Sequence, residues 1–296
     1  MFSRRHPFLF FLLALTALVG GTLVCISLLF TLGRGISRLD FGQKVGVIEV
    51  SGAITEAEET LERLKQFRED DTIRAIVIRI NSPGGGVGPS QEIYSEIRKT
   101  IPTKKVIASL GSVAASGGYY LAAAANGIVA NPGTITGSIG VILGYTDLQE
   151  VFRKIGLAPV VVKSGTFKDM GSPLRAMSKD EQAILQRFVD KIHQQFVQAV
   201  AQGRNMDIAA VAQLADGRIY TGEEALGLGL VDRLGNLTDA IEWAGRLGGI
   251  EGDPNVVYAR EKTGSFLKYF LESTVKALME QVTTSVPGGG YLLHTR

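Results

Sequence analysis

Two kinds of apolar pattern alternate along the first half of the chain. Short runs rich in β-branched residues at 45–50, 73–80 and 106–110 are typical of strands that are buried on both faces of a sheet. Between them, the segments 54–67 and 89–101 carry apolar residues every three or four positions, which indicates amphipathic helices. This alternation predicts an α/β fold with right-handed crossovers between parallel strands.

Shorter elements are predicted in the middle of the chain. The alanine-rich run 121–125 favours a helix, and the short apolar runs at 128–130 and 139–143 are separated by the loop sequence NPGTITGS. Residues 148–155 are then predicted to form a helix and Pro159–Val162 a strand.

The second half of the chain is predicted to be mostly helical. Ser178–Glu181 is a capping box that opens a long helix ending near Gly203. Asp207 and Thr221 are expected to cap two short helices. Further helices are predicted over 236–247 and 265–282, and the apolar stripe of the long helix consists of Ile184, Phe188, Ile192, Phe196 and Val200.

The N-terminal segment Phe8–Leu32 contains no charged residue and is dominated by Leu, Phe, Val and Ala. At about 1.5 Å per residue, a helix of this length can cross a hydrocarbon core of roughly 30 Å. A cleaved signal peptide is the alternative, but its apolar region is normally shorter, and no convincing A-x-A site precedes Leu32. We expect an uncleaved anchor over 1–33 and a linker over 34–44; arginines on both sides leave its orientation open.

Composition narrows the function classes. The 296 residues, 45% of them hydrophobic, suffice for one large domain or two small ones. A net charge of +2 does not indicate a nucleic-acid partner. Cys25 is the single cysteine, which excludes an internal disulfide framework and a cysteine metal site, and we expect neither metal nor cofactor.

The segment Leu110–Tyr120, LGSVAASGGYY, offers a candidate nucleophile. A predicted strand breaks there into Gly and Ser residues and restarts as a helix, which places Ser116 at a helix N-terminus. Gly117 and Gly118 behind it let a substrate approach closely. A helix start whose small residues only pack tightly is the alternative.

The loop Pro83–Gly86 offers backbone N–H groups that no side chain blocks. Together with the N–H of Gly117, they form a candidate oxyanion hole. The loop has neither a G-x-G-x-x-G pattern nor a Walker lysine, which disfavours a phosphate loop. A tight structural turn remains the alternative, and the sequence does not say which of Gly84–Gly86 faces the serine.

The serine also needs a base. His6, His193 and His294 are the three histidines, and none follows a strand-end loop; His193 is predicted to be a surface or packing residue of the long helix. A lysine can act as a base when it is uncharged, and burial can lower a lysine pKa by up to about 3–5 units. Lys168 is the candidate, and Lys163 competes with it.

Two alternatives stay open around these residues. Either lysine could be an ordinary solvated loop charge. Ser138, in a glycine loop between two apolar runs, is the candidate hydroxyl that would orient the lysine, although a turn serine is the default interpretation.

Five motifs in this order carry a resemblance to a known family. They are INSPGGGV, SVAASGGYYLA, TGSIGV, SGTFKDMGSP and IYTGEEALGLGLVD, and they run through the region from Val45 to Leu247. The sequence resembles the S49 signal peptide peptidase family, in its short bacterial form with a single catalytic domain.

The resemblance implies a crotonase-like and ClpP-like α/β fold with a helical C-terminal half. It also implies a serine endopeptidase with a Ser–Lys dyad that degrades remnant signal peptides and other membrane-associated peptides. Carried over by motif, Ser116 is the nucleophile, Lys168 the general base and Ser138 the residue that orients Lys168. Gly85 and Gly117 would supply the oxyanion N–H groups.

The resemblance assigns the peptidase domain to 45–250. From their own pattern, and not from the resemblance, residues 251–296 are predicted to form a C-terminal extension with an amphipathic helix and a flexible tail. We expect a single-pass protein of the inner (plasma) membrane with its catalytic domain on the extracytoplasmic side, assembled as a homo-oligomeric ring. The competing hypotheses are a crotonase-fold enzyme acting on acyl thioesters and a non-catalytic membrane scaffold.

Overall fold

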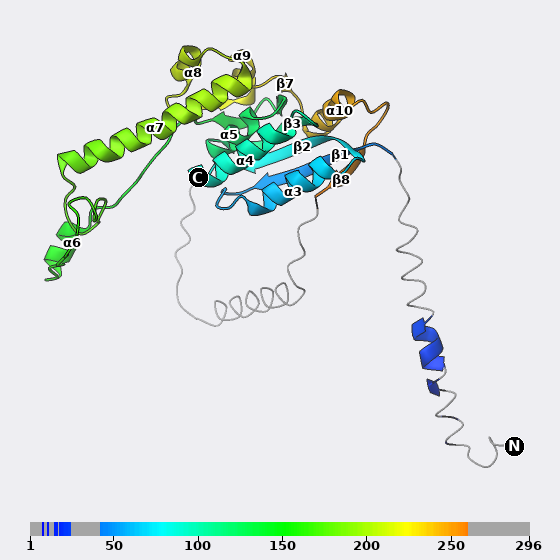
Figure 1. The fold of residues 1–296 in the computed structure, drawn as a ribbon, viewed down its shortest axis with the longest axis horizontal. Helices are drawn as coiled ribbons and strands as arrows, with labels where there is room; N and C mark the ends of the chain where they lie inside the picture. Colours follow the sequence, from blue (N-terminus) through cyan, green and yellow to red (C-terminus); the bar gives the residue numbers. More distant parts are fainter. Residues whose placement is uncertain (1–7, 9–10, 12–14, 17, 25–41, 260–296) are drawn as a thin grey trace, which may run out of the picture. The chain divides into compact units, whose positions relative to one another are not determined.

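The computed structural model describes residues 42–259, together with Phe8, Phe11 and residues 15–16 and 18–24 (Figure 1). Residues 1–42 and 43–296 form two separate compact units. None of the helices within the described residues is long and apolar enough to cross a membrane. The predicted anchor over 8–32 lies largely outside the described residues, as does the predicted helix over 265–282.

The described strands form one eight-stranded sheet in the order β6-β5-β3-β2-β1-β8, with β4 attached to β3 and β7 to β4. Neighbouring strands are parallel except for β5 and β6. The strands are β1 Lys44–Ser51, β2 Ile73–Ser82, β3 Lys105–Ala115, β4 Gly127–Ala130, β5 Ile135–Gly137, β6 Ile219–Thr221, β7 Arg233–Leu234 and β8 Asn255–Tyr258. The last strand lies in the segment that the sequence assigns to the C-terminal extension, and it pairs with β1.

Helices cover both faces of the sheet because successive residues of the central strands point to opposite faces and most of them are apolar. Ile76, Ile78 and Ile80 of β2 pack with α3, α4 and α5 on one face, whereas Ala75 and Val77 pack with α10 on the other. Figure 1 shows α3, α4 and α5 lying across the first face. The helices are α3 Glu58–Glu69, α4 Val87–Thr100, α5 Gly117–Ala123, α6 Gln149–Lys154, α7 Lys179–Arg204, α8 Ile208–Leu214, α9 Gly222–Gly227 and α10 Leu237–Leu247.

The predicted alternation of strands and helices is confirmed, as are the predicted caps Ser178, Asp207 and Thr221. The first helix begins at Glu58 and not at Ile54, because Ile54 forms an isolated β-bridge with Gly85. The three caps satisfy backbone N–H groups that the helices leave free, so these helix starts follow from local sequence.

Strand β3 is longer than predicted. It continues past Leu110 because its pairing with β2 shifts register between Ile80 and Ser82, and its last residues, Val113–Ala115, gain β5 as a second neighbour. The expected glycine loop therefore shrinks to a sharp turn at Ser116 itself, between β3 and α5.

Residues 141–195 form an arm, with α6 at its far end, that projects beyond the sheet along α7 (Figure 1). The predicted strand Pro159–Val162 is wrong: this run forms no ladder, and the side chains of Val160 and Val162 are 88% and 97% exposed. Within α7, only Glu181 and residues between 196 and 201 are buried, so of the predicted apolar stripe Phe188 is exposed and Ile184 and Ile192 are only half-buried. The arm has apolar surface that the described residues do not cover.

Candidate active site

Ser116 occupies the turn between β3 and α5 in a strained conformation. Its φ of 52° lies in the left-handed region, which residues with a side chain rarely adopt. Its N–H donates to Gly137 O at 2.9 Å, and its carbonyl accepts from Tyr120 N at 2.8 Å. Among the described residues, Ser116 Oγ has no hydrogen-bond partner. Strain of this kind costs about 1–3 kcal/mol and concentrates at functional sites, so the fold holds this hydroxyl free at the end of a strand.

Ser138 lies beside it. Residues Ala115 and Gly137 are partners in the β3–β5 ladder, so the residues that follow them, Ser116 and Ser138, are neighbours. Ser138 also has a positive φ, of 50°, and its N–H donates to Arg218 O at 2.8 Å. Both serines line one open groove of about 590 Å³.

The glycine loop presents one N–H group to this groove. Gly84 N donates to Ser82 Oγ at 3.1 Å, and Gly86 N donates to Ile54 O at 2.8 Å. Gly85 N has no partner among the described residues, because the bridge with Ile54 uses the groups on either side of it. The fold therefore selects Gly85 among the three glycines.

Gly117 completes the arrangement. A Cβ at residue 117 would lie 2.6 Å from Ser90 Oγ and 3.2 Å from Gly85 N, which shows how closely the two glycines approach. As the first residue of α5, Gly117 has an N–H without a partner in the described part of the chain. Two N–H groups without a partner among the described residues thus lie close to Ser116, an arrangement that can stabilise an oxyanion.

Lys168 does not join this groove within the same chain. It lies between α6 and α7 in the arm, its side chain is exposed, and it lines neither cavity next to Ser116. Figure 1 shows that the arm places the segment between α6 and α7 far from α5. One chain therefore brings together Ser116, Ser138, Gly85 and Gly117 but not the predicted base.

The two competing lysines differ in their partners. Lys163 Nζ donates to Asp169 Oδ1 at 2.5 Å and to Thr166 O at 2.9 Å, so its ammonium holds the turn together. Lys168 Nζ has no hydrogen-bond or ion-pair partner among the described residues. Of the two, Lys168 carries the amine that is free for another role.

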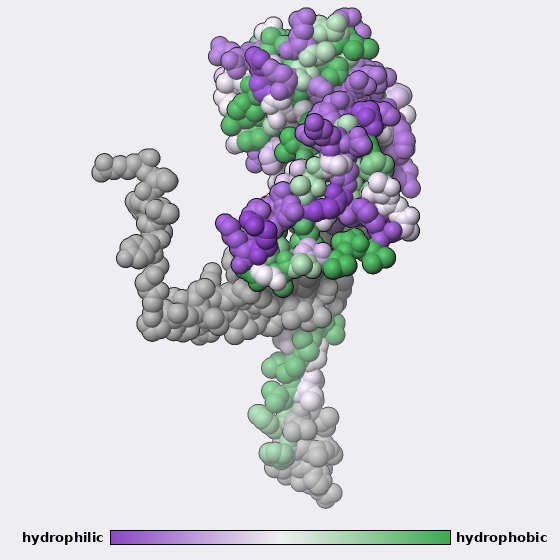
Figure 2. Space-filling model, turned by 90° about the vertical axis from the view of Figure 1, so that its left-hand side faces the viewer, coloured by the Kyte–Doolittle hydropathy of each residue, from purple (hydrophilic) through white to green (hydrophobic). Residues whose placement is uncertain are grey.

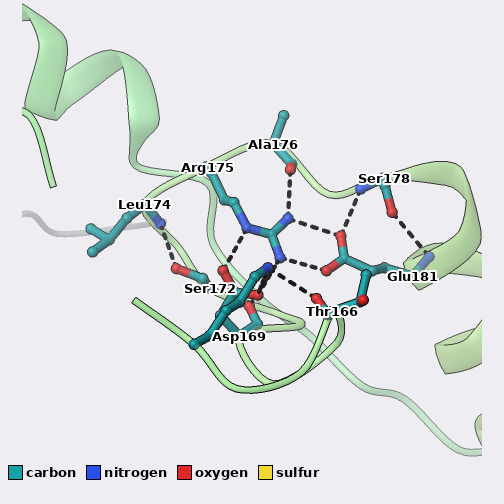
Figure 3. Close-up of polar contacts among 9 residues, drawn as sticks. Thr166, Asp169, Ser172, Leu174, Arg175, Ala176, Ser178 and Glu181 are labelled. Carbon is teal, nitrogen blue, oxygen red and sulfur yellow. Dashed lines mark hydrogen bonds and ion pairs between the residues drawn. The ribbon is translucent and has the colours of Figure 1, made fainter. Parts of the chain in front are cut away.

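A guanidinium links this turn to α7 (Figure 3). Arg175 Nε and Nη2 donate to the two carboxylate oxygens of Asp169, each at 2.9 Å. Arg175 Nη1 and Nη2 donate to Glu181 at 2.9 and 2.5 Å, and Glu181 in turn accepts from Ser178 N at 2.8 Å in the capping box of α7. Hydrogen bonds from Arg175 and Lys163 hold the pKa of Asp169 far below its usual value, and those from Arg175 and Ser178 lower the pKa of Glu181 to about 2.

Comparison with known proteins identifies the family. The family model of peptidase family S49 matches residues 99–251, and that of Clp protease matches residues 43–135. The chain is 46% identical over 213 residues to a putative protease of Synechocystis sp., which covers 71% of this chain and 76% of that protein. The chain belongs to peptidase family S49. The S49 chain is also 38% identical over 229 residues to a putative signal peptide peptidase SppA of Enterococcus faecium, which covers 72% of this chain and 64% of that protein.

A solved structure supports the fold of the S49 domain. A mutant of the 1510-N membrane-bound stomatin-specific protease aligns with a TM-score of 0.50 at 20% identity, over 75% of this chain and 99% of its own. Together with the Clp protease match, this likeness confirms the predicted ClpP-like α/β fold.

Sequence reasoning missed the contribution of α7 to the groove of the S49 domain. His193, Asp190 and Gln186 line the same groove as Ser116, together with Asp216 from the segment before β6. The sequence predicts a surface or packing role for His193; its Nε2 is buried and has no hydrogen-bond partner among the described residues. The helical pattern locates the apolar stripe but not the position at which the helix crosses the groove, so no local signal identifies these residues.

Gly84 offers a test of how tightly the S49 site is packed. Its φ is +107°, and a Cβ there would lie 2.8 Å from Gly117 N and 2.9 Å from Ser116 Cβ. We expect Gly84→Ala to cost about 1–3 kcal/mol of stability through overpacking, and to reduce any hydrolytic activity by more than this loss of folded protein accounts for. Thermal unfolding and turnover measure the two effects. Gly133→Ala is the matched control, since a Cβ there meets nothing within 4 Å, and an unchanged Gly84→Ala protein would contradict the packing.

The arm is expected to loosen in acid before the body of the S49 domain. The pKa of Glu181 is lowered from 4.5 to about 2 in the folded state, so its ion pair stabilises the arm above pH 4.5 and is lost as the pH falls toward 2. Asp169 shifts in the same direction. Hydrogen exchange, corrected for intrinsic rates, should rise in residues 163–181 while β3 stays protected. Equal protection of both segments down to about pH 3 would contradict this expectation.

Proposed function

We propose that this S49 protein is a membrane-anchored serine endopeptidase that uses Ser116 and Lys168 as a catalytic dyad on remnant signal peptides. One observation carries the proposal: a strained, unpartnered serine hydroxyl lies in an open groove, close to the N–H groups of Gly85 and Gly117, which have no partner in the described part of the chain. That combination suits acyl transfer, in which a carbonyl oxygen becomes negative next to the nucleophile.

The proposed reaction has two steps. Ser116 Oγ attacks the peptide carbonyl while the neutral Lys168 amine accepts the hydroxyl proton, and the N–H groups of Gly85 and Gly117 stabilise the oxyanion. Lys168 then gives the proton to the leaving amine, which leaves an acyl-enzyme. Water attacks the ester, with the same amine relaying its proton, and Ser116 is regenerated. Ser138 would orient Lys168 by a hydrogen bond.

The proposal requires Lys168 to come from a second copy of the chain. Lys168 lies in the arm, away from the groove of its own chain, and the arm exposes large apolar side chains such as Ile142, Leu157 and Val162. Figure 2 views the molecule from the side toward which α6 projects, and apolar patches lie open there among hydrophilic surface. Apolar surface of this kind favours a protein partner. Packing an arm onto the neighbouring groove would shield the amine from water and, repeated around an axis, would give the homo-oligomeric ring.

The groove fits an extended apolar peptide. Its apolar lining comes from Val87, Val141, Ile142 and Val189, while Gln186, Asp190 and His193 of α7 make its other side polar. We propose that the anchor over 8–32 keeps the peptidase at the plasma membrane, on the extracytoplasmic side, where cleaved signal peptides remain in the bilayer. The Clp-like fold supports the chemistry but does not select this substrate.

A turnover assay on the full-length protein tests the proposal. We expect cleavage of a quenched fluorogenic peptide with an apolar core, labelling of Ser116 by a fluorophosphonate, and a rate that rises toward alkaline pH, since the base must be neutral. The same preparation should not hydrolyse a short-chain acyl thioester. Thioester turnover without peptide cleavage would instead support the crotonase-type alternative, and failure of both reactions would support a scaffold.

A further inference from the structure

The turn that carries Lys168 is held by backbone hydrogen bonds and by side chains on both sides of it. Lys168 N donates to Gly165 O at 3.1 Å, Met170 N to Phe167 O at 3.1 Å and Ser172 N to Asp169 O at 3.0 Å. These three successive tight turns fix the backbone around Lys168, but they do not fix the turn relative to the rest of the arm.

Arg175 supplies that second connection. Its planar fork engages both oxygens of Asp169, the residue after Lys168, and both oxygens of Glu181, the third residue of α7 (Figure 3). The Glu181 side chain is 4% exposed and the Asp169 side chain 14%, so the two carboxylates are largely shielded from water, whereas the Arg175 side chain is 32% exposed. A bidentate guanidinium restricts both distance and orientation, which a single flexible ammonium does not.

The network also affects the charge next to the proposed base. Asp169 is adjacent to Lys168 in sequence, and a free carboxylate there would favour the protonated, inactive form of the amine. In the structure both carboxylate oxygens are taken by Arg175, and Lys163 binds one of them as well. With Glu181 included, the network contains two positive and two negative groups, and Lys168 forms no ion pair in the part of the chain described.

We infer that Asp169, Arg175 and Glu181 form a clip that positions Lys168 relative to α7 and keeps the Asp169 carboxylate away from the Lys168 amine. This inference rests on the proposed function, because it assigns a role to the clip in the reaction of Lys168. The three residues are positioning residues: they act through Lys168 and not on the substrate.

Full-length variants assayed over a range of pH test the clip. Arg175→Gln should lower kcat by about 10- to 100-fold, the scale expected for a misplaced catalytic group, with little change in KM. It should also move the rising limb of the rate profile, which is set by deprotonation of Lys168, up by about one pH unit, because Asp169 Oδ2, which only Arg175 binds among the described residues, becomes free to pair with the amine. Arg175→Lys keeps the charge but not the fork and should not rescue kcat.

A second variant separates the two roles. Asp169→Asn keeps the Arg175–Glu181 pair and the α7 cap, so the arm should stay folded. It should lower kcat without moving the rising limb of the pH–rate profile to higher pH. Adding Asp169→Asn to Arg175→Gln should return the limb to its wild-type position. Arg153→Gln, which breaks the exposed Arg153–Glu150 pair on α6, is the matched control and should leave kcat and the profile unchanged.

The outcomes discriminate between the clip and the proposed function. An inactive Lys168→Gln protein together with Arg175→Gln and Asp169→Asn proteins of wild-type kcat and pH profile would overturn the clip alone. A fully active Lys168→Gln protein would overturn the assignment of the base. A lower kcat in Arg175→Gln with an unmoved rising limb would overturn the role of Arg175 in keeping the Asp169 carboxylate away from the Lys168 amine. If thermal unfolding shows that Arg175→Gln is unfolded, the kcat of the folded Asp169→Asn protein decides whether the clip positions Lys168.

Discussion

Replacing Ser116 by alanine is expected to abolish peptide hydrolysis, with a loss of at least about 10³-fold, because no other hydroxyl takes the place of the nucleophile. The fold should survive. Ser116 Oγ has no hydrogen-bond partner among the described residues, and alanine tolerates the φ of 52° about as poorly as serine does. Turnover, fluorophosphonate labelling and thermal unfolding together measure this result.

Ser112 provides the control for this change. It is an exposed serine on the same strand, so Ser112→Ala should retain both activity and labelling. Full turnover by the Ser116→Ala protein would remove the serine from the mechanism.

Replacing Lys168 by glutamine is expected to cost about 10²–10⁴-fold in kcat, the usual contribution of a general base, while the protein keeps its folded stability. The structure makes the comparison with Lys163 informative. Lys163 already binds Asp169 and Thr166 O, so Lys163→Gln should loosen the turn, lower stability slightly and cost activity far less.

His193 is the competing base that the fold reveals, since it lines the same groove as Ser116. His193→Gln should retain activity within a few-fold if Lys168 is the base. The opposite pattern, an inactive His193→Gln protein and an active Lys168→Gln protein, would transfer the role to the histidine.

The sheet and its helices could be predicted from the sequence because their signals are local. The run 73–80 is apolar at every position but two, as a strand covered on both faces requires, and the capping boxes at Ser178 and Thr221 fix two helix starts. The end of β3 could not be predicted in this way, since it depends on pairing with β5, which lies about twenty residues later in the chain.

The exposure of the arm could not be predicted, because it depends on which distant segments or other copies pack against it and not on the local sequence. Pro159–Val162 has the composition of a buried strand, and Phe188 continues the stripe of α7, yet both stay exposed within one chain. A pattern of apolar residues indicates that a surface is buried in the functional protein. It does not indicate whether the same chain or another copy buries it.

The candidate site likewise has some features that the sequence indicates and others that require the fold. The motifs single out Ser116, Ser138 and Gly117, and the fold brings them together, whereas the choice of Gly85 over its neighbours depends on a bridge to Ile54, about thirty residues away. The distinction between Lys163 and Lys168 depends on the fact that Asp169 binds Lys163 and Arg175 but not Lys168. Both details require the fold.

The most direct test of the central proposal, a serine and a lysine shared between two copies, is complementation between inactive variants. Ser116→Ala and Lys168→Gln proteins are co-expressed so that their subunits mix, and peptide hydrolysis is compared with that of each variant alone. If each site takes its serine from one copy and its lysine from the next, about one quarter of the sites in a random ring regain both groups, and about that share of wild-type activity returns. Activity no higher than that of the separate variants would contradict the shared site.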